Sequence, residues 1–302
     1  MKEKEININA LNLLENQEWS KAQKLFFYNV KINPSYQTYN NLGFYLVSEG
    51  IQCKNGKTRN ATKQGIKYIV KSMELKATSI NLFSMVKAID YQLRDCTADK
   101  KTFYKCACDY LEKALKLKYS DILQYNYLRF LYLLDPNSKG IVDEVRSLVN
   151  NLVSVETVSL YLEILRIYSL KQEGIRCIEK YNDILDEADL LISYAKFGLY
   201  EKGYEVCDSV MAMYSMDQFI ASAVIECCLN TLNFEKAKEY SEQIKEIISN
   251  EKQSKKTKII RAFEKIITSK DERTRILSNY SLVPPIIDSC CYFGCPIHKT
   301  EW

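Results

Sequence analysis

The 302-residue sequence contains few of the residues that make turns, with nine glycines and five prolines. β-Sandwiches and α/β folds need many more, because their tight turns require backbone conformations that glycine and proline favour. Long stretches rich in Leu, Ile, Lys, Glu and Tyr separate these residues. The composition therefore predicts an all-α chain.

Histidine is almost absent, since His298 is the single one in the sequence. Residues 1–270 consequently lack paired histidines on a helix, and they contain neither a glycine-rich phosphate loop nor a nucleophile elbow. These are the usual sequence signatures of metalloproteases, nucleotide-binding enzymes and serine hydrolases. We therefore expect that the protein is not an enzyme.

An excess of charge of one sign is also lacking: 42 Lys and Arg residues nearly balance 38 Asp and Glu residues, for a net charge of +4. The densest basic stretch, residues 252–258, is typical of a solvated helix start rather than of a phosphate-binding surface. No apolar run is long enough to cross a membrane, and the N-terminus shows no signal peptide. We therefore expect a cytoplasmic protein with neither nucleic-acid nor membrane partners.

Cysteine, by contrast, is frequent, with eleven residues. An odd number of cysteines in a reducing compartment does not indicate a disulfide framework. Many of them fall inside apolar helical patterns, where a thiol behaves as a small hydrophobic group. We expect the following to be buried in the core: Cys106, Cys108, Cys177, Cys207, Cys227 and Cys228.

Residues 19–50 carry the most regular pattern of the sequence. Ala22 and Phe26 lie four residues apart, so that a small and a large residue share one helix face before Pro34 ends the helix. A second helix is expected to follow, with small and apolar residues on one face: Leu42, Gly43 and Leu46.

This segment resembles the tetratricopeptide repeat family, in which two antiparallel helices recur about every 34 residues with small residues where the helices cross. The residues from Ala22 to Pro34 match the second helix of one unit, and those from Leu42 to Leu46 match the first helix of the next. The pattern returns in weaker form along the chain. Its small-residue positions are Ala22, Gly65, Ala107, Gly174, Val206 and Ala237, with one more unit near residues 141–152.

The resemblance implies an all-α superhelical solenoid of antiparallel helix pairs over residues 1–270, followed by a C-terminal segment, residues 271–302, with a cysteine-rich tail. A non-repetitive helical bundle is the alternative. In such a solenoid the first helix of each pair lines a concave face that binds an extended peptide or a helix of a partner. We therefore expect a scaffold or adaptor that binds a protein or peptide.

The expected first helices are rich in tyrosine and asparagine. Tyrosine offers rigid contact area with a polar tip, and asparagine can pair with a backbone amide. The candidates for partner binding are Tyr39, Asn41, Tyr45, Tyr125, Arg129 and Tyr161, with Asn40 and Asn126 among the further polar residues of these helices. The competing interpretation is that many of these side chains pack in the core.

A concave face of this kind has two more specific uses. Some members of the family clamp a partner's C-terminal carboxylate, and Asn41 matches one clamp position. Asn7, however, stands where that clamp needs a basic residue, so the clamp is not predicted. A peptide-sensing regulator is a further alternative, although no helix-turn-helix is evident in the sequence.

The final stretch places four metal-ligand residues within nine positions: Cys290, Cys291, Cys295 and His298. Thiolate and imidazole suit Zn²⁺ or an iron–sulfur cluster, whereas no cofactor is expected in the rest of the chain. Zinc sites usually draw their ligands from two separated pairs, which this stretch does not do. Residues 291–298 also resemble the cluster loop of radical SAM enzymes, with histidine in place of the third cysteine and only four residues following.

Two other interpretations of the tail stay open. Its thiols could be the target of a modifying enzyme. Alternatively, its apolar residues could cover the exposed face of the last repeat as a hydrophobic cap. A metal- or thiol-dependent function centred on the tail is therefore the alternative to a binding function of the concave face.

Overall fold

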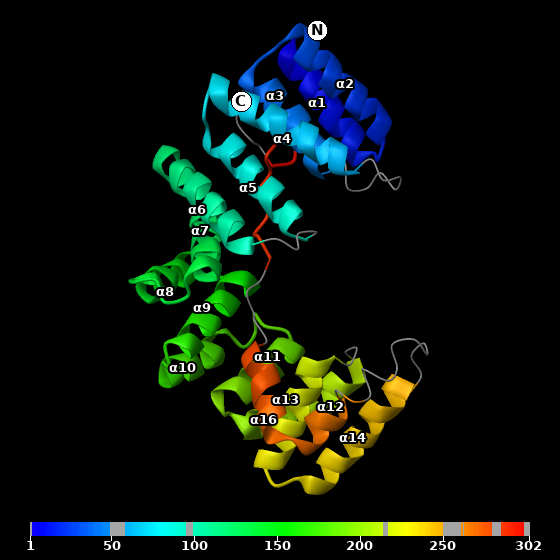
Figure 1. Cartoon of the computed structure of the whole chain (residues 1–302), viewed down its shortest axis with the longest axis vertical. Coiled ribbons are helices and arrows are strands. Elements are labelled where there is room, and N and C mark those ends of the chain that lie inside the picture. The colour runs from blue at the N-terminus through cyan, green and yellow to red at the C-terminus, as the bar shows by residue number, and fades with distance from the viewer. Residues whose placement is uncertain are drawn as a thin grey trace. The chain divides into compact units, whose positions relative to one another are not determined.

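The computed structural model describes residues 2–48, 58–94, 99–213, 217–249, 261, 263–279 and 285–298 (Figure 1). These residues form α-helices joined by turns, and no β-strand occurs among them. The predicted all-α class is confirmed. None of the helices in these ranges combines the length and the apolar character that crossing a membrane requires.

The helices follow one another in pairs. The first helices of the pairs are α1 (Glu3–Glu15), α3 (Tyr36–Ser48), α5 (Ser79–Arg94), α7 (Asp121–Leu134), α9 (Val155–Ile167), α11 (Glu187–Phe197) and α13 (Gln218–Asn230). The second helices are α2 (Trp19–Ile32), α4 (Thr58–Leu75), α6 (Lys100–Leu117), α8 (Ile141–Asn151), α10 (Lys171–Tyr181), α12 (Tyr200–Met213) and α14 (Phe234–Ser249). A further helix, α16 (Lys270–Asn279), comes later in the chain. Helices pack mostly against their neighbours in sequence, as in a helical repeat.

The chain divides into two compact units. Unit 1 consists of residues 1–152 together with residues 285–302, and unit 2 consists of residues 153–284. In unit 2, α16 packs against α13 and α11. The C-terminal segment predicted from residue 271 onward is thus shared between the units, with its first helix in unit 2 and its tail in unit 1. The predicted end of the repeats at residue 270 is not tested by this division.

Four of the pairs share one backbone motif between their helices. The residue two positions before the second helix adopts a left-handed conformation in each, namely Gln17, Ser169, Gly198 and Leu232. The amide of the next residue donates to a carbonyl five residues earlier, as Glu18 does to Leu13 (2.8 Å) and Leu199 does to Tyr194 (2.9 Å). This six-to-one bond is the Schellman ending of a helix, and it turns the chain in the same way each time. The repeat is therefore visible in the backbone.

Small residues mark the crossings of paired helices, as predicted. The fourth residue of α2, α10, α12 and α14 is Ala22, Gly174, Gly203 and Ala237, respectively, and all four are buried. The expected anchor Val206 is only half-buried. The close-approach position of α12 is Gly203 instead, because a Cβ at Gly203 would collide with the sulfur of Cys227.

The helices α3 and α4 of unit 1 cross in close contact at two glycines. A Cβ added to Gly43 would lie 2.8 Å from the carbonyl oxygen of Gly65 and 2.8 Å from the amide nitrogen of Ile69. Such distances are possible only between residues without a side chain, which is why both positions are glycine. The predicted small positions Gly43 and Gly65 therefore face each other.

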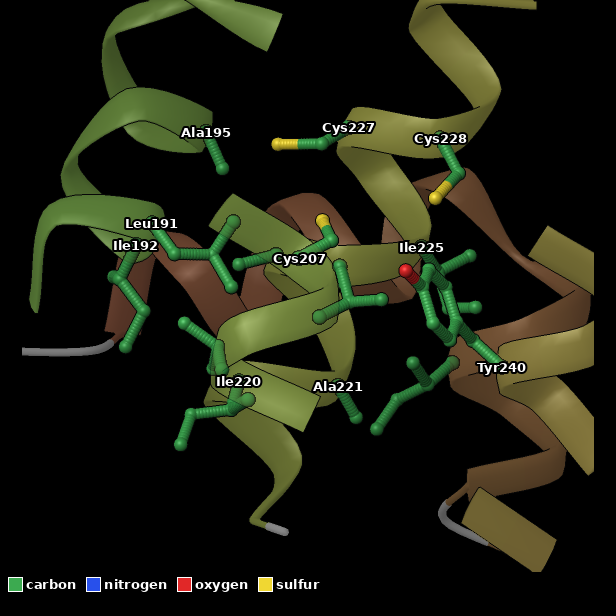
Figure 2. Close-up of a cluster of buried hydrophobic side chains, with 14 of the residues drawn as sticks. Leu191, Ile192, Ala195, Cys207, Ile220, Ala221, Ile225, Cys227, Cys228 and Tyr240 are labelled. Carbon is green, nitrogen blue, oxygen red and sulfur yellow. The ribbon is translucent and has the colours of Figure 1, made fainter. Parts of the chain in front are cut away.

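Unit 2 is held together by an apolar core that contains several thiols (Figure 2). Cys207, Cys227 and Cys228 are fully buried among aliphatic residues such as Leu191 and Ile192. Cys108 and Cys177 are also buried, as expected for small hydrophobic groups, whereas Cys106 is exposed. The expectation of burial thus holds for five of these six cysteines.

Candidate functional site

Residues 285–298 form no helix and lie against the first helices of unit 1. In Figure 1 this segment is the red trace that passes alongside α5. We call residues 285–298 the tail. From its start to its end it meets α7, then α5 and then α3, so it runs against the order of the helices.

Side chains of the first helices bind the backbone of the tail. The hydroxyl of Tyr125 donates to the carbonyl oxygen of Pro285 (3.1 Å). The amide of Asn126 donates to the carbonyl oxygen of Ile287 (3.1 Å). Both donors are fully buried residues of α7, whereas Pro285 is exposed and Ile287 half-buried, so water is kept from the donor side of these bonds.

An asparagine pair on α3 repeats this arrangement further along the tail. Asn40 donates its side-chain amide to the carbonyl oxygen of Cys291 (2.6 Å). Asn41 donates to the carbonyl oxygen of Phe293 (2.9 Å) and accepts from the backbone amide of Phe293 (2.8 Å). This two-point contact satisfies both polar groups of one peptide residue.

The two pairs occupy equivalent positions. Asn40 and Asn41 are the fifth and sixth residues of α3, and Tyr125 and Asn126 are the fifth and sixth residues of α7. On α1 the fifth residue is Asn7, whose fully buried side-chain amide has no hydrogen-bond partner in the part of the chain that the structure describes. The same helical position thus supplies backbone-binding groups in two of the pairs.

One charged contact joins the tail to α5. The Lys87 ammonium lies 3.0 Å from the carboxylate of Asp288, and the Lys87 side chain is only 10% exposed. Burial lowers the pKa of Lys87, but its electrostatic interactions with Cys291 and Asp288 and its hydrogen bond to Asp288 raise it above its usual value. Burial also raises the pKa of the Cys291 thiol to about 12. At neutral pH the charge opposite Lys87 is therefore that of Asp288.

Aromatic contacts hold the side chains of Tyr292 and Phe293 in the tail. The ring of Tyr292 lies edge-on to Phe44, with centroids 4.9 Å apart, and is stacked parallel to Phe26 at 6.0 Å. The ring of Phe293 meets Tyr36 edge-on at 5.4 Å. Both geometries are favourable for aromatic pairs. We call the surface of α3, α5 and α7 on which the tail lies the groove. Its contact residues are Tyr36, Asn40, Asn41, Phe44, Lys87, Tyr125 and Asn126.

Of the predicted partner-binding residues, Asn41 and Tyr125 bind the tail. Tyr39 instead stacks on Tyr68 of α4, with ring centroids 6.1 Å apart. Tyr45 donates its hydroxyl to the carbonyl oxygen of Trp19 (3.0 Å), which ties α3 to the start of α2. Tyr39 and Tyr45 therefore pack between helices, which was the competing interpretation of these tyrosines.

The remaining two candidates also have structural contacts. The guanidinium of Arg129 lies 3.6 Å from the carboxylate of Asp90 on α5. Tyr161 belongs to unit 2, where its hydroxyl is hydrogen-bonded to the carboxylate of Glu173. The sequence prediction missed Lys87, because an isolated lysine in a helix carries no signal of the acidic residue 201 positions later that it meets.

The end of the tail brings three metal-ligand side chains together. One sulfur each from Cys290 and Cys295 and one ring nitrogen of His298 all lie within 4.8 Å of one another. Cys295 Sγ and His298 Nδ1 are 3.2 Å apart. The fourth predicted ligand, Cys291, is outside this group: it is fully buried, and its sulfur lies 3.6 Å from the carbonyl oxygen of Ser289.

A cavity of about 970 Å³ borders the tail. It is lined by residues of α3, α5 and α7 and by the second half of α1. Cys290, Cys295 and His298, which we call the ligand group, also line it. Its volume is that of a typical small-ligand site. Its lining includes the apolar residues Leu11 and Leu14 and the basic residues Lys76 and Lys118.

In comparisons with protein-family models, with curated proteins and with solved structures, nothing matches this chain.

Proposed function

We propose that this chain is a non-enzymatic, peptide-binding scaffold of the tetratricopeptide-like kind, and that the groove of unit 1 binds an extended peptide segment. One observation supports this most strongly. Buried asparagine and tyrosine side chains at equivalent positions of α3 and α7 bind backbone groups of a non-helical segment that is far away in sequence. Binding of this kind depends on an extended backbone rather than on particular side chains.

Side-chain contacts would add selectivity to this backbone recognition. Lys87 faces the acidic Asp288, and aromatic surfaces receive Tyr292 and Phe293 four and five residues later. The peptide that fits the groove best therefore has an acidic residue followed, at this spacing, by two aromatic residues. The tail itself has this pattern and is the built-in occupant, so a partner peptide would replace it.

The direct test uses a fluorescent peptide with the sequence of residues 285–298 and a chain that ends at residue 284. We expect saturable binding, measured by fluorescence polarisation. The full-length chain should bind the peptide far more weakly, because a tethered tail competes at an effective concentration in the millimolar range.

Asn41→Leu provides the specific variant, and Asn137→Leu, at an exposed asparagine, is its matched control. In the full-length chain Asn41→Leu should also speed hydrogen exchange of the Phe293 amide, which loses its acceptor. A loss of about 1–3 kcal/mol is typical when one partner of a buried hydrogen bond is removed. Equal peptide binding by both variants would refute backbone recognition by Asn41.

A second candidate is a metal- or thiol-dependent function centred on the tail. The convergence of Cys290, Cys295 and His298 favours it. The two functions need different residues: in the chain that ends at residue 284, groove variants would impair peptide binding, and in the full-length chain, variants of Cys290, Cys295 and His298 would impair the tail-centred function.

A further inference from the structure

We propose that Cys290, Cys295 and His298 form a binding site for a borderline-soft divalent cation of the Zn²⁺ class, with one coordination position open to the adjoining cavity. The site needs the tail to lie in the groove, as it does in the structure, and does not need the groove to bind a partner peptide at all, so this inference does not rest on the proposed function. Cys291, which the sequence places in the same cluster, is not a ligand.

The distances already approach those of a metal site. Zn²⁺ binds sulfur at about 2.3 Å and nitrogen at about 2.0–2.1 Å, so neighbouring tetrahedral ligands lie about 3.5–3.8 Å apart. The separation of 3.2 Å between Cys295 Sγ and His298 Nδ1 is close to this value. The limit of 4.8 Å for the whole group leaves only side-chain adjustments of about 1 Å, well within rotamer freedom.

The backbone of the tail explains how ligands from one short segment converge. Gly294 has a φ of 77°, which residues other than glycine adopt only at a cost, and it turns the chain between the two cysteines. Asn41 holds the preceding residue, Phe293, by both its amide and its carbonyl. The turn is thus fastened to α3, and the two sulfurs are brought together before any ion binds.

The three side chains of the ligand group differ in solvent exposure, and this difference leaves a path for an ion from solvent. Cys295 is buried, Cys290 is half-buried and His298 is exposed. The histidine also follows Cys295 by three residues within a turn, so its ring can swing toward the thiols from the solvent side. We expect the two thiols to form the fixed part of the site and the imidazole to complete it.

The donor set selects the class of metal. Two thiolates and one imidazole suit Zn²⁺ and related borderline ions, whereas hard ions such as Mg²⁺ and Ca²⁺ require oxygen ligands. Three protein ligands leave one tetrahedral position for water or a small ligand, as in zinc sites with exchangeable ligands. The cavity lined by all three side chains provides the space for that ligand.

Metal binding would also fasten the tail in the groove. An ion that binds only the ordered turn stabilises it in proportion to the logarithm of ion concentration over dissociation constant. Because the turn is joined to α3 through Asn41, that stabilisation extends to the contacts between tail and groove.

The experiment is a titration of the reduced, metal-free full-length chain with Co²⁺, followed by back-titration with Zn²⁺. Co²⁺ reports its ligands by thiolate charge-transfer and d–d absorption bands. We expect one equivalent with tetrahedral, sulfur-ligated bands that Zn²⁺ abolishes. Each of Cys290→Ser, Cys295→Ser and His298→Asn should weaken the apparent affinity by about 100-fold or more, beyond the 10- to 100-fold typical of losses outside the ligand shell.

Two control variants make the result specific. Cys106→Ser removes an exposed thiol outside the group, and Cys291→Ser removes the neighbouring thiol that is not a ligand. Both should retain the Co²⁺ bands at full intensity. The proposal is overturned if the full-length chain binds no stoichiometric Co²⁺ or Zn²⁺, or if the bands survive in the three ligand variants. Loss of the bands in Cys291→Ser, with helix content by circular dichroism unchanged, would also overturn the assignment.

Discussion

Single buried polar side chains join segments that are distant in sequence. Asn41 holds Phe293 across 252 positions, and Arg273 of α16 donates to Glu226 of α13 (2.7 Å) across 47 positions. Arg273 also donates to the carbonyl oxygen of Ile266 (2.9 Å). Removing one partner of such a buried pair leaves the other unsatisfied, which costs more than the bond contributes when present. These residues therefore determine where each segment docks.

Tyr240 gives unit 2 a testable dependence on pH. Burial, followed by its hydrogen bond to Asp208 (2.7 Å), raises the pKa of Tyr240 above its usual value of 10.0. Above pH 10 the unfolded chain therefore loses this proton while the native protein keeps it. The stability that Tyr240 contributes is fully present below pH 10 and is lost as pH rises further.

We accordingly expect the advantage of the native protein over Tyr240→Phe, in free energy of unfolding, to shrink above pH 10. The decrease can reach about 1.4 kcal/mol per pH unit. Urea unfolding of both proteins between about pH 8 and about pH 11 measures it. Tyr28→Phe, at a half-exposed ring, should show no such trend. An advantage of Tyr240 that stays constant over this range would contradict the pKa shift.

Among the structural elements, the repeated Schellman turn has one left-handed residue, and the type of this residue differs from one helix pair to the next. The left-handed residue is glycine at Gly198 but leucine at Leu232, and the Leu232 side chain is 73% exposed. A left-handed conformation costs a residue with a Cβ about 1–2 kcal/mol. The turn before α14 therefore carries backbone strain that the turn before α12 avoids.

Exchanging the residue type at these two turns should have opposite effects. Leu232→Gly is expected to stabilise unit 2 by about 1 kcal/mol, and Gly198→Ala to destabilise it by a similar amount. Thermal unfolding followed by circular dichroism compares the two variants with the parent chain. Changes of the same sign in both would show that the turn conformation does not govern their stability.

Sequence patterns predicted these elements well, because helix pairing is a local property. Ala22, Ala107 and Ala237 are buried where the spacing placed them. The sequence pattern indicated Val206 and did not include Gly203. Residues three apart share one helix face, and periodicity alone does not tell which of them meets the partner helix. Only the contact with Cys227 decides between them.

On the scale of the whole molecule, the division into two units predicts a selective effect of the tail. A chain ending at residue 284 should lose stability in unit 1 and keep it in unit 2. Phe293 and Ile286 of the tail are buried in unit 1, and full burial of such a side chain is worth about 1.5–3 kcal/mol. Hydrogen exchange should therefore accelerate in α3, α5 and α7 and stay unchanged in α11 and α13.

A chain ending at residue 298 serves as the control and should exchange like the full-length protein in all five helices. Adding the tail peptide in trans should restore protection in unit 1 of the shortened chain. Equal acceleration in both units, or none in either, would contradict the assignment of the tail to unit 1.

The sequence by itself determined the helical class, the pairing of successive helices and the clustering of ligand residues near the end of the chain. These properties follow from residue spacing and from low glycine and proline content, which act within a few turns of chain. Only the tertiary structure decided that the tail lies in the groove and that Cys290, rather than Cys291, lies beside Cys295 and His298. It also decided that Tyr39 and Tyr45 make contacts within unit 1. Such choices depend on contacts across about 250 residues, for which local periodicity carries no information.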